Sequence, residues 1–194
     1  MNGDRALERL LAGNRRYVTS RQNHPNQTPE RRAELKDGQN PFAVVLGCSD
    51  SRVPPEFIFD QGLGDLFIVR VAGNVVDNMV LGSIEYAVSH LKTPLIVVLA
   101  HSNCGAVTAT VSAGHHELPG QLGYVTASIQ PAVDLVGDLP DDKVNRVSRA
   151  NAEIAAEQLR NAKPILFDSV EAGTLTVVAA YYHLSTGSVE ILSQ

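Results

Sequence analysis

The chain has little of what marks several large protein classes. It contains two cysteines and no tryptophan among 194 residues, and no apolar run is long enough to span a bilayer. The net charge is −5 without a long block of either sign, so we expect neither a nucleic-acid nor a membrane partner. The first residues lack the apolar core of a signal peptide. We therefore expect a cytoplasmic protein whose two thiols stay reduced rather than forming a disulfide.

Short apolar runs alternate with amphipathic segments, as is typical of an α/β domain with a mostly parallel central sheet flanked by helices. Parallel strands are expected at residues 42–46, 66–71, 95–100 and 174–182, and an antiparallel edge strand at 189–192. Helices are expected at residues 6–18, 29–37, 75–91, 105–113, 129–136 and 144–159. We predict a single domain over 1–194, with an N-terminal helical arm (1–40) before an α/β core (41–194).

The arm contains two expected helices and no strand. The second helix has a clear start, because the hydroxyl of Thr28 can cap it and Pro29 suits the first helical position. From the residues alone, the arm can pack on its own sheet or on a partner subunit.

Two polar turns follow two of the predicted strands. Residues 48–52 read Cys-Ser-Asp-Ser-Arg, and residues 101–105 read His-Ser-Asn-Cys-Gly. The carboxyl ends of parallel strands meet at one edge of the sheet, which is where open α/β sheets bind their ligands. The two turns together offer two thiols, one imidazole and one carboxylate, from Cys48, Cys104, His101 and Asp50.

This set of donor groups predicts a zinc site, because thiolates and imidazoles are ligands that zinc prefers. Asp50 can act as the fourth ligand, or it can form a bidentate salt bridge with Arg52. In the second case zinc keeps an open position for water, whose pKa it lowers to about 7. Hydration or hydrolysis by a zinc-bound hydroxide is then the expected chemistry.

The two turns resemble the signature of the β-class carbonic anhydrases. Similar segments occur at residues 60–65, 70–74 and 82–87, and the resemblance is strongest over residues 41–113. It implies a zinc-dependent carbonate dehydratase that reversibly hydrates carbon dioxide to bicarbonate and a proton. It also implies a homodimer, with the pairing of dimers into tetramers left open.

The resemblance gives roles to the residues of the two turns. It implies that Cys48, His101 and Cys104 are zinc ligands and that Asp50 and Arg52 form a catalytic dyad. In an open state Asp50 would accept a hydrogen bond from the zinc-bound water or hydroxide while Arg52 keeps it off the metal. In a closed state Asp50 would itself be the fourth zinc ligand.

Four further positions match the substrate pocket of the family. Gln39 corresponds to an amide that hydrogen-bonds a substrate oxygen, Phe67 and Tyr86 to aromatic walls, and Gly105 to a backbone amide near the substrate. Part of this wall belongs to a neighbouring subunit in the family, so we expect an obligate dimer with the N-terminal helices on the partner. Without the resemblance, Phe67 and Tyr86 are ordinary core residues and Gln39 is a surface amide.

One branch of the family is regulated by a second bicarbonate site, which favours the closed state. Its members carry a tryptophan three residues before the first zinc-ligand cysteine, where this chain has Val45. Gly47, Val53 and Arg70 are compatible with that branch. We expect the bicarbonate lock to be absent or weak.

Three other functions stay open at this point. They are hydrolysis of carbon disulfide or carbonyl sulfide on the same scaffold, a non-catalytic zinc-binding assembly domain, and a redox protein that uses both cysteines. The sequence also leaves the proton acceptor unidentified. His115, His116 and His183 are candidates only because histidine titrates near neutral pH.

Overall fold

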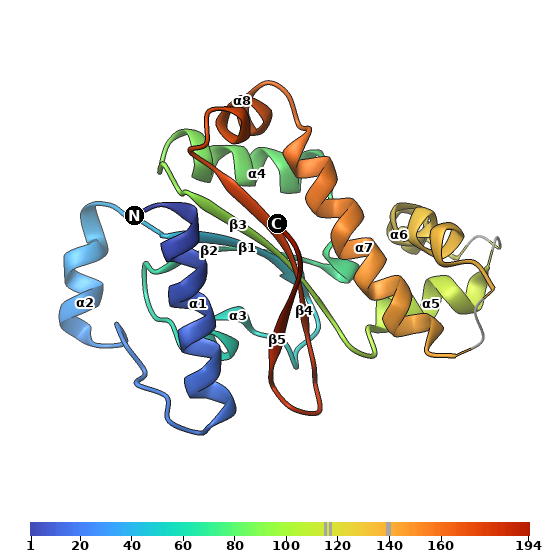
Figure 1. Ribbon diagram of the computed structural model, residues 1–194, viewed down its shortest axis with the longest axis horizontal. Coiled ribbons are helices and arrows are strands. Elements are labelled where there is room, and N and C mark those ends of the chain that lie inside the picture. The colour runs from blue at the N-terminus through green and yellow to red at the C-terminus, as the bar shows by residue number, and fades with distance from the viewer. Residues whose placement is uncertain (115, 117, 139–140) are drawn as a thin grey trace.

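Five strands form one mixed sheet in the computed structural model, which describes residues 1–114, 116, 118–138 and 141–194 (Figure 1). The strand order is β2-β1-β3-β4-β5, with β1 to β4 parallel and β5 antiparallel to β4. The strands are β1 (Ala43–Cys48), β2 (Leu66–Val71), β3 (Leu95–His101), β4 (Thr176–Tyr182) and β5 (Val189–Ser193). This confirms the predicted sheet, including its antiparallel edge.

Helices cover both faces of the sheet. They are α1 (Gly3–Val18), α2 (Pro29–Glu34), α3 (Pro55–Ile58), α4 (Asn78–Ser89), α5 (Gly105–Ala113), α6 (Leu122–Val136), α7 (Lys143–Arg160) and α8 (Ile165–Glu171), with short 3-10 turns η1 (Leu35–Asp37) and η2 (Ala72–Asn74). Side chains alternate across each strand, so one apolar cluster joins the sheet to α1, α5 and α6, and another joins it to α4 and α8. The long helix α7 contributes to both clusters.

Two helices begin at other residues than predicted, and two short helices were not predicted at all. The helix expected at 75–91 begins at Asn78 because the side chain of Asp77 caps it by accepting from the N–H of Val80 at 2.8 Å. Helix α6 begins at Leu122 instead of residue 129 and contains Pro131 in its interior. The short helices α3 and α8 were not predicted.

The two helices of the arm are placed differently. Helix α1 packs on its own sheet, because Ala6 and Leu10 are completely buried in the core of the same chain. Helix α2 lies at the outer edge of the molecule beyond α1 (Figure 1), and none of its residues is buried. Packing of the arm on a partner subunit stays a prediction, and of the two helices only α2 has no buried residue.

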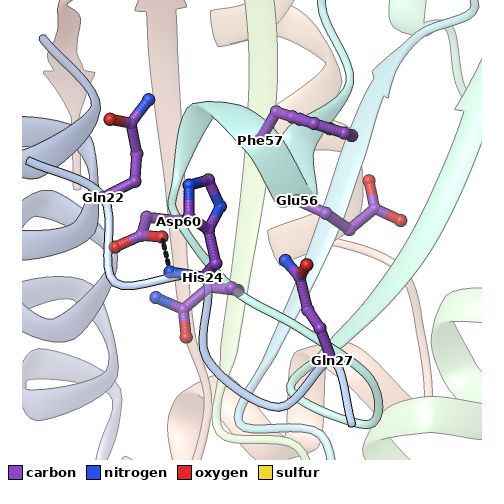
Figure 2. A pocket seen from close by; sticks show the side chains of 7 residues that line it. Gln22, His24, Gln27, Glu56, Phe57 and Asp60 are labelled. Atoms are coloured by element: carbon purple, nitrogen blue, oxygen red, sulfur yellow. Dashed lines mark hydrogen bonds between the residues drawn. The ribbon is translucent and has the colours of Figure 1, made fainter. Parts of the chain in front are cut away.

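Asp60 fixes the loop that joins the two helices of the arm. Its buried carboxylate accepts hydrogen bonds from the guanidinium of Arg16 at 2.6 Å and from the backbone N–H of Asn23 at 3.0 Å. A third comes from the backbone N–H of His24 at 3.0 Å (Figure 2). The hollow beside it has a volume of about 40 Å³, room for only a few water molecules. This corner of the molecule is therefore a structural anchor.

No helix among the described residues has both the length and the apolar character needed to cross a membrane.

Candidate metal centre

The ends of two adjacent strands and the start of a helix bring three buried side chains together. Cys48 ends β1, His101 ends β3, and Cys104 immediately precedes α5. One potential ligand atom from each lies within 4.8 Å of the others, and this is the one such group found in the described part of the chain. We call Cys48, His101 and Cys104 the metal group. Three of the four donor groups predicted from the two polar turns therefore converge, whereas Asp50 is not part of the group.

The spacing of the metal group fits one tetrahedral ion. The two sulfur atoms are 3.9 Å apart, whereas a disulfide requires about 2.05 Å, and both cysteines are free. Two thiolates on a tetrahedral zinc ion, with bonds of about 2.3 Å, are expected about 3.8 Å apart. The observed separation therefore matches a shared metal and not a disulfide.

His101 is held with one ring nitrogen facing the two thiols. Its Nδ1 lies 2.9 Å from the carbonyl oxygen of Ser102, to which it can only donate. Its Nε2 is buried and has no hydrogen-bond partner among the described residues. A buried imidazole nitrogen without a partner is costly, and a metal ion would satisfy it.

The two thiols share one hydrogen bond, which shifts their pKa values in opposite directions. The hydrogen bond with Cys104 is the main reason why the pKa of Cys48 is lowered, although burial opposes it. The same bond, together with burial, raises the pKa of Cys104. The backbone N–H of Gly73 also donates to the sulfur of Cys48 at 3.3 Å. Two sulfur atoms this close together in a buried site offer a soft ligand pair for a cation.

Asp50 lies next to the metal group and is bound by Arg52. The guanidinium donates to its two oxygens at 2.9 and 2.7 Å, and the Arg52 backbone N–H donates at 2.9 Å. One carboxylate oxygen is 4.0 Å from Nε2 of His101. These bonds from Arg52 hold the pKa of Asp50 far below its usual range, so the carboxylate is ionised beside the site.

Arg70 supports the turn that carries Cys48 and Asp50, a role that the sequence did not predict. Its Nε donates to the carbonyl oxygen of Cys48 at 2.9 Å and its Nη2 to that of Asp50 at 2.6 Å. In the sequence, Arg70 was noted only because it lies within a segment that resembles the family and is compatible with the regulated branch. These contacts are to the backbone, and no pattern of residue types could reveal them.

The four predicted pocket residues are not all near the metal group. Gly105 follows Cys104 at the start of α5. Phe67 pairs with Val44, four residues before Cys48 on β1 and therefore about 13 Å away along the strand. Tyr86 on α4 has its ring 6.3 Å from that of Phe67. Gln39 lies in the segment that precedes β1. Within one chain, only Gly105 adjoins the site.

The three histidines considered as proton acceptors also differ in position. Nε2 of His183 is 3.1 Å from the carboxylate of Glu190, which Arg149 also binds. His116 lines a hollow beside α6. His115 lies outside the described residues.

Comparison with known proteins places the chain in a family. The carbonic anhydrase family profile matches residues 43–189. A carbonic anhydrase of Mycolicibacterium smegmatis is 45% identical over 190 residues, covering 97% of this chain and 92% of that protein. Carbonic anhydrase 2 of Mycobacterium tuberculosis is 43% identical over 186 residues, covering 94% and 89%. The chain belongs to the β-class carbonic anhydrases.

Solved β-carbonic anhydrases have the same fold. A tetrameric enzyme of Sordaria macrospora superposes with a TM-score of 0.76 at 28% identity, covering 96% of both chains. The Coccomyxa enzyme in complex with acetazolamide gives 0.75 at 30% identity, covering 82% of this chain and 75% of the other. The activity is that of a carbonate dehydratase, which hydrates carbon dioxide. This favours carbon dioxide over carbon disulfide or carbonyl sulfide, and it argues against a non-catalytic or redox role.

Proposed function

We propose that the metal group holds a zinc ion at which carbon dioxide is hydrated to bicarbonate and a proton. The observation that carries this proposal is the unpartnered Nε2 of His101 beside two thiols whose sulfur atoms are 3.9 Å apart. Zinc, when bound there, supplies a Lewis acid that yields hydroxide near neutral pH. Two thiolates and one imidazole are a suitable ligand set for it.

In this proposal Asp50 and Arg52 are the catalytic dyad. The double hydrogen bond from Arg52 keeps Asp50 ionised and occupies both of its carboxylate oxygens, so that the fourth position would be available to water. As an ionised acceptor, Asp50 can hold the proton of that water and point its lone pair toward carbon dioxide. If Arg52 releases it, Asp50 can become the fourth ligand and exclude water. The dyad would thus gate the site.

A second copy of the chain would complete the substrate pocket. Gly105 offers its backbone N–H beside the metal group, while Gln39, Phe67 and Tyr86 lie elsewhere on the same chain. We propose that these three side chains contribute to the pocket of a partner subunit in a homodimer. The open hollow between Phe67 and Tyr86 supports this, because it leaves the aromatic rings accessible at the edge of the sheet. Two such dimers can form a tetramer like the Sordaria macrospora enzymes.

Metal analysis combined with stopped-flow carbon dioxide hydration tests the proposed function. We expect one zinc ion per chain in the wild-type protein, and loss of both zinc and activity in Cys48→Ser and His101→Ala. His183→Ala is the matched control, because it removes an imidazole just beyond the end of the neighbouring strand β4. It should keep its zinc. Wild-type protein that hydrates carbon dioxide without bound metal would refute the proposal.

A further inference from the structure

The turn η2 contacts the metal group through a backbone N–H. Gly73 donates to the sulfur of Cys48 at 3.3 Å, and both are buried. Gly73 has a φ of +70°, and a Cβ atom there would lie 2.7 Å from Cδ1 of Ile129. Asn74 is also left-handed, with a φ of +44°. Glycine adopts such a conformation without strain, whereas at Asn74 it persists because the surroundings fix it.

Asn151 on α7 supplies such a fixing contact. Its side chain is 4% exposed, and its Nδ2 donates to the carbonyl oxygen of Gly73 at 2.8 Å. The contact joins residues 78 positions apart in the sequence. Ser148, one turn earlier and equally buried, bonds only within its own helix, to the carbonyl oxygen of Val144. The side chain of Asn151 therefore reaches out of α7 to the turn beside Cys48.

We propose that Asn151 is a positioning residue for the metal site. By holding the carbonyl of Gly73, it keeps the Gly73 N–H directed at the sulfur of Cys48. A hydrogen bond from an amide to a thiolate withdraws charge from the sulfur and orients it. A site with two thiolates needs such a hydrogen bond, because the combined negative charge of the two sulfur atoms would otherwise make the metal a weaker Lewis acid. This inference rests on the proposed zinc site.

The test compares Asn151→Ser and Asn151→Ala with Ser148→Ala. The side chains of serine and alanine are too short to reach the carbonyl oxygen of Gly73. Serine already occupies the buried position 148 of the same helix, so we expect the fold to accept it at position 151. We expect both Asn151 variants to bind zinc about tenfold more weakly in a chelator competition, the lower end of the range seen when a residue that hydrogen-bonds a metal ligand is removed, because Asn151 acts through Gly73. We also expect a shift of the thiolate-to-metal charge-transfer band in the cobalt-substituted protein. Ser148→Ala should match the wild type in both measurements.

Three outcomes would overturn the inference. Folded Asn151 variants could bind zinc with wild-type affinity and spectrum, or Ser148→Ala could weaken zinc binding equally. Failure of both Asn151 variants to fold in the presence of zinc would assign Asn151 to the fold instead. Zinc content and carbon dioxide hydration are measured on the same wild-type preparation. A wild type without zinc refutes the proposed function, whereas equal zinc affinity in wild type and variants refutes only this inference.

Discussion

Asp50 lies between two groups that can bind its carboxylate, the guanidinium of Arg52 and the metal group. The geometry favours Arg52, with contacts of 2.9 and 2.7 Å against 4.0 Å to Nε2 of His101. A bidentate pair of this kind fixes the direction of the carboxylate as well as its charge. The same residue can therefore serve as an acceptor in one state and as a metal ligand in the other.

Asp50→Asn tests the role of that charge. The amide keeps the shape of the side chain but cannot act as an anionic acceptor, so we expect zinc to be retained and kcat to fall at least about 100-fold. Glu157→Gln is the control, because Arg160 binds Glu157 at 3.3 Å and also donates to the carbonyl oxygen of Val177 near the start of β4, at the opposite end of the sheet from the metal group. Stopped-flow hydration and metal content are measured for both. Full activity in Asp50→Asn would contradict the assigned role.

Arg70 bears on regulation by bicarbonate. Its Nε and Nη2 already donate to the carbonyl oxygens of Cys48 and Asp50, so its guanidinium is committed to the turn. With Val45 in place of the tryptophan of the regulated branch, we expect high bicarbonate to cause no strong inactivation at mildly alkaline pH. A pH series of activity with and without bicarbonate checks this. Strong loss of activity confined to the bicarbonate arm would show that the lock is present.

At the scale of single residues, the sequence predicts side chains better than it predicts backbone contacts. Cys48, His101 and Cys104 were predictable because each adjoins the end of an apolar strand, and parallel strand ends converge. Gly73 and Asn151 could not be found this way. Their roles depend on an N–H and a C=O that every residue carries, and on a contact between distant parts of the chain.

Among the elements, the strands and the long helices were predictable, and three helical features were not. Helices α3 and α8 have 4 and 7 residues, too few for a helical period to stand out. The first turns of α6 contain Gly123, and Pro131 lies in its interior, so local propensity opposes a helix that burial of its Ile129 face stabilises. Tertiary packing, and not the local sequence, makes these segments helical.

The carboxylate of Asp60 allows a test of how the arm is held. In Asp60→Ala, the guanidinium of Arg16 and the N–H groups of Asn23 and His24 lose a buried acceptor, so we expect the free energy of unfolding to fall by about 3 kcal/mol. Asp134→Ala removes an exposed carboxylate and should change stability by less than about 0.5 kcal/mol. Urea unfolding at neutral pH measures both. Equal effects would contradict the role of Asp60 as an anchor.

The lowered pKa of Asp60 predicts that its contribution to the stability of the fold depends on pH. Burial raises the pKa of Asp60, but the N–H groups of Asn23 and His24 and the charge of Arg16 outweigh it, so the net pKa lies below its usual value of 3.8. A carboxyl with a lowered pKa stabilises the fold above its unfolded pKa and loses that effect as the pH falls through the folded value. The stability difference between wild type and Asp60→Ala should therefore be complete above about pH 5 and shrink below pH 4.

The whole molecule has one sheet edge that a single chain leaves open. Strand β2 is the first strand of the sheet, all six of its residues are only partly buried, and nothing among the described residues pairs with its outer side. An apolar edge strand of this kind readily associates with another chain. Beside it, Met79 and Tyr86 on α4 are 79% and 47% exposed. The aromatic residues assigned to the substrate pocket thus lie beside the open edge, as the proposed homodimer requires.

Met79→Glu tests whether this edge forms the proposed dimer. A carboxylate buried at the interface must be desolvated without a partner, so we expect the dimer dissociation constant to rise at least about tenfold in analytical ultracentrifugation. Hydration activity should fall in parallel as the protein is diluted, because monomers lack the aromatic wall from the partner. Leu135→Glu is the control, since Leu135 is 70% exposed on α6, away from β2. Full activity in a monomeric Met79→Glu protein would show that one chain completes the site alone, and Phe67 and Tyr86 would then have no part in catalysis.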